Sequence, residues 1–357
     1  MSVTREDVLA TLSRIADPVA GGDIVASGLV RALTVDGGTI RFVMEIGPDQ
    51  AEVMTPVRAQ AEAALRGLTG VTQVQIAMTA HGTPKPPPDL KPRPSATGPQ
   101  PVPGVRRIIA VASGKGGVGK STVAANLACA LAAAGKRVGL LDADVYGPSQ
   151  PRMLGVSARP ASPDGKTIIP LVAHGVAMMS LGLLTKENEA LIWRGPMLMG
   201  ALQQMLFQVA WTQGGADLDV LIVDLPPGTG DVQLTLAQKV PVTGAVIVST
   251  PQDVALLDAR KGIDMFRKLN VPILGLIENM SVHICSTCGS AEHIFGHGGV
   301  RAEAEQMGVP LLAEIPLHLS IRTGGDDGVP VVVAAPGSPQ AEAFHQVARR
   351  LIGGGIV

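Results

Sequence analysis

The sequence has 357 residues, of which 46% are apolar and 17% charged, enough to bury a sizeable core and to form two domains. A net charge of −1 gives no electrostatic reason for strong non-specific binding to nucleic acid or to an anionic membrane. The N-terminus shows no secretory leader, no run approaches the roughly 20 apolar residues that span a bilayer, and the three cysteines make no disulfide framework. We therefore expect a cytoplasmic protein that binds neither nucleic acid nor membrane.

Residues 1–81 predict a small α/β domain. Apolar residues at helical spacing alternate with apolar runs that suit strands, and Asp36-Gly37-Gly38 predicts a turn between two of the strands. The predicted order is helix 8–15, strand 29–35, strand 40–46, helix 57–65 and strand 71–76. The spacing of polar residues in this domain indicates no catalytic group.

Residues 82–104 predict a linker. Their dense prolines exclude a helix or a central strand and favour extended polyproline II, so the linker is expected to be semi-rigid. A ligand for a peptide-recognition domain is the alternative that the composition leaves open.

Residues 105–357 alternate apolar runs with helical segments. The predicted strands are 108–112, 138–141, 220–223, 245–248 and 273–277. Continuous apolar runs of this kind indicate a mostly parallel, doubly wound α/β sheet that is covered by helices on both faces. Ligands of such sheets bind beyond the carboxyl ends of the strands.

A P-loop follows the first of these strands. Residues 114–121, GKGGVGKS, match the pattern G-x-x-x-x-G-K-S, and the helix-forming run 123–134 comes next. We expect Lys120 to reach the β- and γ-phosphates of ATP, and Ser121 to ligate Mg²⁺ through its hydroxyl. The backbone expected to cradle the nucleotide is that of Gly114, Gly116, Gly117, Val118, Gly119, Lys120, Ser121 and Thr122.

Two acidic segments complete the predicted nucleotide site. Asp224 ends an apolar strand, where a carboxylate can hold the metal through water, and Gly228 allows backbone contact with the γ-phosphate. Asp142 and Asp144 end another strand, where one of them could position the attacking water or hold metal-bound waters. We assign Asp142 and Asp224 to the metal and Asp144 and Asp224 to catalysis. A turn residue at the strand end is the alternative for Asp142.

Residues 115–122, KGGVGKST, resemble the deviant P-loop shared by MinD, ParA, the nitrogenase iron protein and the arsenite-pump ATPase. In that group the extra lysine, here Lys115, reaches across a nucleotide-bound homodimer to the partner's phosphates. The resemblance thus makes Lys115 catalytic together with Lys120. It also implies a homodimer that switches between two arrangements set by ATP and ADP.

Cys285 and Cys288 form a C-x-x-C pair. A closed tetrahedral metal site needs four ligands, and a two-fold dimer would supply two cysteines from each subunit. Four thiolates suit either a [4Fe–4S] cluster or zinc, and spacing alone also leaves a thioredoxin-like dithiol open. Three nearby histidines, His283, His293 and His297, could ligate as well. Cys129 falls in the helix after the P-loop and is expected to be a buried, small apolar residue.

From about residue 105 to 350 the chain resembles the Mrp/ApbC type of iron–sulfur cluster carrier ATPase. The matching segments are 114–122, 142–149, 193–197, 224–231, 249–252, 278–281, 285–288, 294–299, 315–317 and 321–322. The resemblance implies that Asn279 and the segment after Pro316 hold the adenine, and that Cys285 and Cys288 hold a bridging [4Fe–4S] cluster. The implied partners are cluster scaffold proteins and apo iron–sulfur proteins.

Residues 1–81 resemble the small domain of iron–sulfur assembly factors, including Asp17-Pro18 and residues 28–30. Stand-alone members often carry a reactive cysteine that this domain lacks, so we expect it to act in docking.

Two other functions remain open at this point. A spatial regulator of the MinD or ParA kind would act on membrane or DNA, but residues 340–357 carry little basic charge, and we expect them to form the last helix of the domain. A dimer bridged by zinc, with the metal purely structural, is the third possibility.

Overall fold

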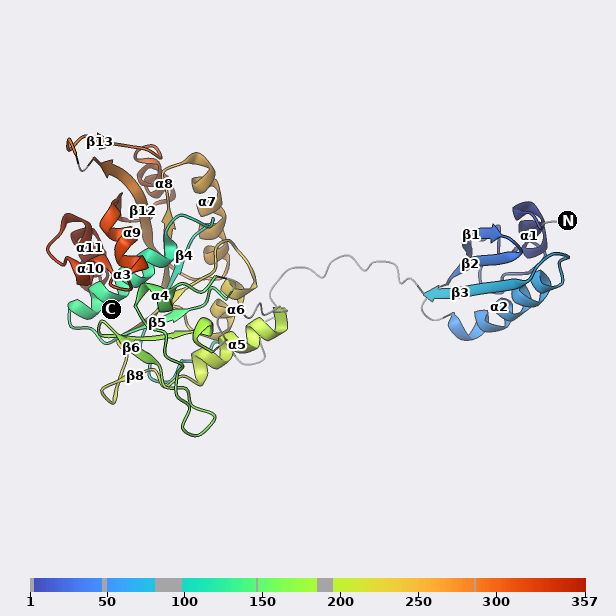
Figure 1. Ribbon diagram of the computed structural model, residues 1–357, viewed down its shortest axis with the longest axis horizontal. Coiled ribbons are helices and arrows are strands. Elements are labelled where there is room, and N and C mark those ends of the chain that lie inside the picture. Colours follow the sequence, from blue (N-terminus) through green and yellow to red (C-terminus); the bar gives the residue numbers. More distant parts are fainter. Residues whose placement is uncertain (1–2, 47–49, 81–97, 146, 185–194, 286) are drawn as a thin grey trace. The chain divides into compact units, whose positions relative to one another are not determined.

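The computed structural model describes residues 3–46, 50–80, 98–145, 147–184, 195–285 and 287–357. The chain divides into two units, residues 1–93 and 94–357, and each is described by itself (Figure 1). Most of the predicted linker lies outside the described residues. Its last part packs on the large unit, where Val102 is buried and the Gln100 N–H donates to the Lys239 carbonyl at 2.8 Å.

The small unit is a three-stranded sheet with both helices packed against its core. Its elements are α1 (Arg5–Leu12), β1 (Val30–Asp36), β2 (Thr39–Ile46), α2 (Ala51–Arg66) and β3 (Gln73–Ala80). β2 lies in the middle, antiparallel to β1 and parallel to β3. Alternation along β2 buries Ile40, Phe42, Met44 and Ile46, as the sequence pattern predicts.

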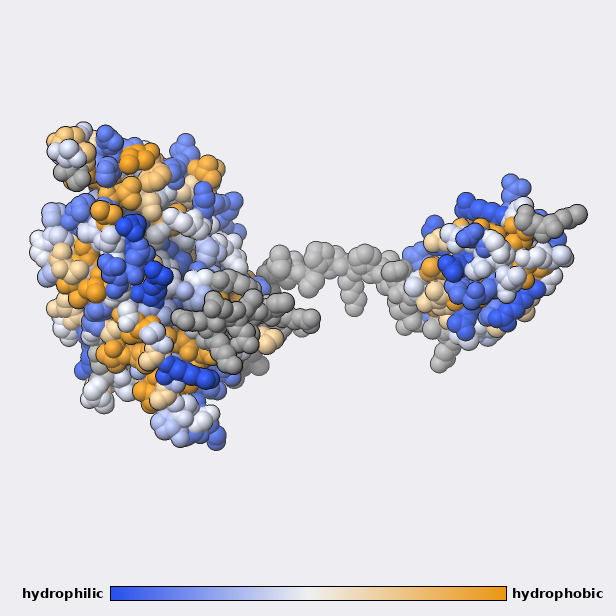
Figure 2. Space-filling model, in the orientation of Figure 1, coloured by the Kyte–Doolittle hydropathy of each residue, from blue (hydrophilic) through white to orange (hydrophobic). Residues whose placement is uncertain are grey.

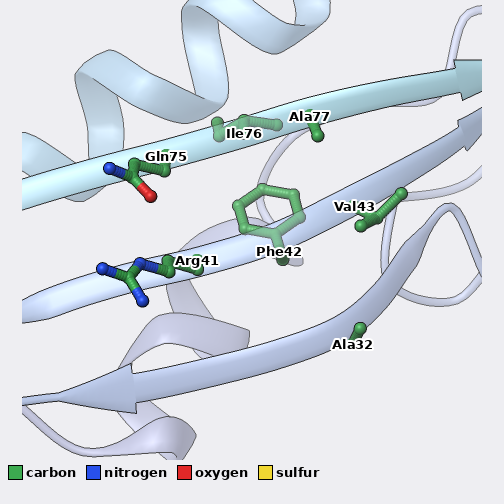
Figure 3. Close-up of a pocket in the computed structure, with 7 residues that line it drawn as sticks. All are labelled: Ala32, Arg41, Phe42, Val43, Gln75, Ile76 and Ala77. Atoms are coloured by element: carbon green, nitrogen blue, oxygen red, sulfur yellow. The ribbon is translucent and has the colours of Figure 1, made fainter.

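A β-bulge in β1 interrupts its pairing with β2. The pairing of β1 with β2 shifts between Arg31 and Thr34, and Ala32 adopts a positive φ of 51°. A pocket of about 460 Å³ lies along the three strands at this point. Figure 3 shows its lining, which is Ala32, Arg41, Phe42, Val43, Gln75, Ile76 and Ala77.

The large unit is built on a sheet of nine strands among the described residues. Strand order is β13-β12-β11-β4-β10-β5-β7-β6, with β14 paired to β12. All neighbours pair in parallel except the edge strands β6 and β13. The strands are β4 (Ile108–Ala112), β5 (Val138–Asp142), β6 (Leu171–Ala173), β7 (Val176–Ser180), β10 (Val220–Asp224), β11 (Gly244–Ser249), β12 (Ile273–Ile284), β13 (Ala291–Glu292) and β14 (Leu311–Leu317).

Helices cover both faces of this sheet, and a two-stranded ribbon, β8 (Thr212–Gln213) and β9 (Ala216–Asp217), lies apart from it. The helices are α3 (Lys120–Ala133), α4 (Gln150–Met153), η1 (Leu181–Leu183), α5 (Gly195–Phe207), α6 (Asp231–Lys239), α7 (Asp253–Lys268), α8 (Gly299–Met307), α9 (Leu319–Asp326), α10 (Val331–Ala334) and α11 (Pro339–Gly353). One core contains residues of α3, α10 and α11, and the other contains residues of α5 to α8. Adjacent residues such as Ile108 and Ile109 belong to opposite cores, which is why the strands are apolar throughout.

The predicted fold class, a mostly parallel α/β sheet covered on both faces, is confirmed. The five predicted strands correspond to β4, β5, β10, β11 and β12. The prediction of a last helix is also correct, because α11 buries Phe344, Val347 and Leu351 in the core. Within the described part of the chain, no helix combines the length and the apolar composition needed to cross a membrane.

The approach of α7 to the P-loop gives a test of the fold. A Cβ added at Gly114 would lie 2.1 Å from the main-chain carbon and oxygen of Asp258 in α7. Gly114→Ala should therefore reduce the free energy of unfolding of the large unit by about 1–3 kcal/mol, as overpacking does. Urea unfolding followed by tryptophan fluorescence measures this unit selectively, because both tryptophans, Trp193 and Trp211, belong to it.

Gly262→Ala, in the interior of α7, is the control. A Cβ there meets no atom within 4 Å, so the better helix propensity of alanine should raise stability by about 0.5–1 kcal/mol. Equal stability of the two variants would contradict the close packing of α7 on the P-loop.

Candidate functional site

The P-loop joins β4 to α3 at the carboxyl edge of the sheet. Gly117 and Gly119 have φ angles of 82° and 83°, a left-handed conformation that favours glycine. A pocket of about 210 Å³ opens at the loop, and its lining is Ser113, Lys115, Gly116, Gly117, Gly119, Lys120, Ser121, Thr122, Asp144, Ser149, Met153 and Pro227. Turned glycines before a helix N-terminus fit the phosphates of a nucleotide.

Lys120 and Asp224 form a buried ion pair beneath this pocket. Lys120 Nζ donates to Asp224 Oδ1 and also, at 3.2 Å, to Ser121 Oγ. The Lys120 side chain is 6% exposed and that of Asp224 is fully buried, so little water screens the pair. The fold thus brings Asp224, predicted from the second acidic segment, to the two P-loop residues predicted to bind phosphate and metal, Lys120 and Ser121.

Asp142 anchors the loop that follows β5. Its Oδ2 accepts hydrogen bonds from the Ser149 N–H, the Gln150 N–H and the Ser180 hydroxyl, at 3.1, 3.2 and 3.1 Å. Its Oδ1 accepts one from the Asp144 N–H at 3.2 Å. Burial raises the pKa of Asp142, and the neighbouring Asp224 carboxylate raises it further.

These hydrogen bonds show that Asp142 stabilises the turn at the end of its strand, which was the alternative to metal binding. The carboxylate is buried and already accepts four hydrogen bonds. Metal binding by Asp142 stays a prediction. Asp144, in contrast, lines the pocket at the P-loop.

The loop after β10 fastens to the P-loop. The Gly228 N–H donates to the Ser113 carbonyl at 2.9 Å, and Gly228 itself has a φ of 91°. Gln233, buried in α6, donates from Nε2 to the carbonyls of Pro226 and Gly228, at 2.8 and 3.0 Å. Gly228 therefore lies beside the P-loop, consistent with its expected place near the phosphates.

Sequence reasoning missed Gln150. It is completely buried, and its Nε2 donates to Asp224 Oδ2 at 2.8 Å and to the Ser121 carbonyl at 3.0 Å. No motif contains it. Only the fold, which places the start of α4 between the ends of β10 and the P-loop helix, could identify it.

Asn279 connects β12 to the P-loop. Its Nδ2 donates to the Val118 carbonyl at 2.8 Å, and a Cβ on Gly119 would lie 2.2 Å from the same nitrogen. Pro316 follows Ile315, the residue of β14 that pairs with Asn279. The two residues expected at the adenine are thus on neighbouring strands, and adenine binding remains a prediction. Met280, next in β12, has a positive φ of 57°.

The two cysteines lie just beyond the end of β12. The Gly289 N–H donates to the Cys285 carbonyl at 2.8 Å, and the Cys285 N–H donates to the Ser290 carbonyl at 2.9 Å. The main-chain N–H groups of Cys288 and Thr287 donate to the Cys285 sulfur and lower the pKa of this thiol. The loop therefore favours a thiolate, the form that binds metal.

Neither cysteine is in a disulfide bond. Cys285 is partly exposed, and Cys288 is exposed. Ser286 between them lies outside the described residues. Cys129 is buried as predicted, and burial raises the pKa of its thiol to about 12. Ile284 and Ile294 near the loop are 48% and 56% exposed, and apolar patches interrupt the polar surface on the face of the large unit seen in Figure 2.

The histidines near the cysteines have other contacts. His293 Nδ1 lies 2.8 Å from the Ser281 carbonyl, and its ring lies 4.2 Å from that of His297. His283 Nδ1 lies 3.4 Å from the Leu317 carbonyl. Over the described ranges, no three side chains of His, Cys, Asp or Glu come together as a metal site. One chain therefore offers the cysteine pair without further ligands from this part of the structure.

Comparison with known proteins identifies both units. The large unit matches a family model described as a NUBPL iron-transfer P-loop NTPase over residues 104–352. The small unit matches one described as an iron-sulfur cluster assembly protein over residues 5–76.

Two relatives and a solved structure agree with this. An iron-sulfur cluster carrier protein from Synechocystis sp. is 44% identical over 98% of both chains. One from Pseudomonas fragi is 59% identical over 68% of this chain and 84% of its own length. A nucleotide-binding protein from Archaeoglobus fulgidus, solved in complex with ADP, has a TM-score of 0.58 at 36% identity and covers 68% of this chain and 93% of its own. The resemblance inferred from the motifs is confirmed, and the chain belongs to the NUBPL iron-transfer P-loop NTPase family.

Proposed function

We propose that this protein hydrolyses ATP and carries a [4Fe–4S] cluster, held between two copies of the chain, to apo iron–sulfur proteins. The observation that carries the proposal is the course of β12. This one strand contacts the P-loop through Asn279 and leads, six residues later, to the Cys285–Cys288 loop, whose N–H groups favour a thiolate. The iron-sulfur cluster carrier proteins that resemble this chain support the cargo.

The nucleotide half of the proposal rests on the buried ion pair. Lys120 would exchange Asp224 for the β- and γ-phosphates, which leaves the Asp224 carboxylate free to hold Mg²⁺ with Ser121. When bound, Mg²⁺ supplies positive charge at the phosphate oxygens. Asp144, in the wall of the pocket, would orient the attacking water. The relative solved with ADP supports a nucleotide in this pocket.

Lys115 fits a role in a second copy of the chain. Its side chain is exposed at the edge of the P-loop, whereas Lys120 is buried in the same loop. An exposed lysine there can neutralise charge on the phosphates of a facing subunit, and two facing subunits would bring four cysteines together. The exposed apolar residues Ile284 and Ile294 suit burial in that contact.

The small unit would serve in docking to scaffold or client proteins. Its match to an iron-sulfur cluster assembly protein supports this, and its lack of cysteine argues against transfer through a thiol of its own.

Substitution of the two P-loop lysines should separate binding from hydrolysis. Lys120→Ala should weaken ATP binding about 10- to 100-fold, because a charge-assisted contact to the phosphates is lost. Lys115→Ala should bind ATP within about threefold of wild type but hydrolyse it about 100-fold more slowly or worse, as loss of a charge supplied across an interface does. Equilibrium binding and phosphate release measure the two effects. The same assays with GTP test whether the site prefers adenine over guanine. Full hydrolysis by Lys115→Ala would count against the dimer mechanism.

The cysteines should divide into two that hold the cluster and one that does not. After reconstitution without oxygen, wild type should contain about four irons and four sulfides per dimer. Cys285→Ala and Cys288→Ala should lose both while keeping ATP binding. Cys129→Ala, which changes a buried thiol far from ionisation, is the matched control and should retain the cluster. Stoichiometric zinc without sulfide would contradict the proposed cluster and would indicate that the cysteines hold a structural metal.

A further inference from the structure

A buried glutamine joins the two residues proposed to hold the metal. Gln150 Nε2 donates both to Asp224 Oδ2, at 2.8 Å, and to the Ser121 carbonyl, at 3.0 Å. Both partners are acceptors, so the amide nitrogen must face them and the orientation of the side chain is fixed. Gln150 thereby sets the distance between the Asp224 carboxylate and the residue whose hydroxyl would ligate Mg²⁺.

The bond to Asp224 gains importance once nucleotide binds. Among the hydrogen bonds of the described residues, Asp224 Oδ1 accepts from Lys120 and Oδ2 accepts from Gln150. When Lys120 turns to the phosphates, Gln150 is left to orient a carboxylate that is fully buried. A buried carboxylate with a single fixed donor presents its other oxygen in one direction.

The oxygen of the same amide is unused. Gln150 Oε1 is buried and has no hydrogen-bond partner in the part of the chain that the structure describes. Buried amide oxygens are ordinarily satisfied, by protein or by water. Mg²⁺ keeps several of its own waters when it binds to protein and phosphate, and each of these waters is a hydrogen-bond donor.

The main chain of Gln150 extends the connection. Its N–H donates to Asp142 Oδ2 at 3.2 Å, and Asp142 pairs with Asp224 at the ends of the neighbouring strands β5 and β10. Through one residue, therefore, the loop after β5 is bonded to Asp142, to Asp224 and to the P-loop helix.

We infer that Gln150 is a positioning residue for the metal: it fixes Asp224 relative to Ser121 and offers Oε1 to a metal-bound water. It acts through Asp224 and the water, and touches neither the phosphates nor the reacting atoms. The inference rests on the proposed binding of nucleotide with Mg²⁺. It makes the loop after β5 responsive to the metal as well as to the nucleotide.

The test is the Mg²⁺ dependence of nucleotide binding, measured with a fluorescent ADP analogue on the full-length chain. Gln150→Met has a similar length and no hydrogen bonds. It should bind the analogue in EDTA within about twofold of wild type, because Gln150 is not among the residues that line the P-loop pocket. Mg²⁺ is expected to increase the affinity for the analogue, and the Mg²⁺ midpoint is the concentration that gives half of this increase. In Gln150→Met this midpoint should rise about tenfold or more. An unchanged Mg²⁺ midpoint would overturn the inference and leave the nucleotide site standing.

Asn126→Leu is the matched control for a lost buried amide. Asn126, on α3, donates to the Thr122 carbonyl at 2.9 Å and accepts from the Val332 N–H at 3.3 Å, away from Asp224. It should lower the melting temperature but keep the wild-type Mg²⁺ midpoint. A rise in that midpoint equal to that of Gln150→Met would reduce Gln150 to a packing residue.

Gln150→Asn provides a second route if Gln150→Met does not fold. It retains an amide, but the side chain is one methylene too short to reach both partners, and it should show the same shift in Mg²⁺ midpoint. A wild-type midpoint in Gln150→Asn would again overturn the inference. Failure of wild-type protein to bind the analogue at any Mg²⁺ concentration would be a different result, since it removes the proposed nucleotide function itself.

Discussion

The pairing of Lys120 with Asp224 is the interaction on which the site is built. Both side chains are almost entirely withdrawn from water, and a buried ion pair is tolerated only where geometry and further hydrogen bonds compensate for lost hydration. The parallel sheet provides that geometry by ending β4, β5 and β10 side by side. The loops that leave these strands then bond to the pair through Gln150 and to each other through Gly228, while Asp142 holds the loop after its own strand.

Much of this could be predicted from the sequence because the relevant patterns are local. A strand buried on both faces must be apolar at every position, so β4, β5, β10, β11 and β12 were all found. The P-loop glycines are likewise identifiable by spacing, since their turned backbone requires them. β7 and β14 were missed, and the three-residue η1 and four-residue α4 and α10 are too short to show a period.

Long-range hydrogen bonds could not be predicted in the same way. Gln150 contacts Asp224, 74 residues away, and Asn279 contacts Val118, 161 residues away. Nothing in the spacing of a glutamine or an asparagine states which carbonyl or carboxylate it will meet, because the partner is set by the packing of whole strands. The predicted site residues were therefore those that belong to motifs, and the residue missed was one that belongs to none.

The course of β12 has a mechanical consequence for the cysteines. Up to Glu278 the strand lies within the sheet, paired with both β11 and β14. Beyond Asn279 and the left-handed Met280, its pairing with β14 shifts register. The last length pairs with β13 through only two residue pairs, and Figure 1 shows it projecting from the sheet toward β13. Few backbone hydrogen bonds resist displacement of this end of β12, whereas many hold the part of the strand before Asn279. The strand is thus stiff beside the P-loop and compliant beside the thiols, so the cysteine loop can move without any opening of the sheet.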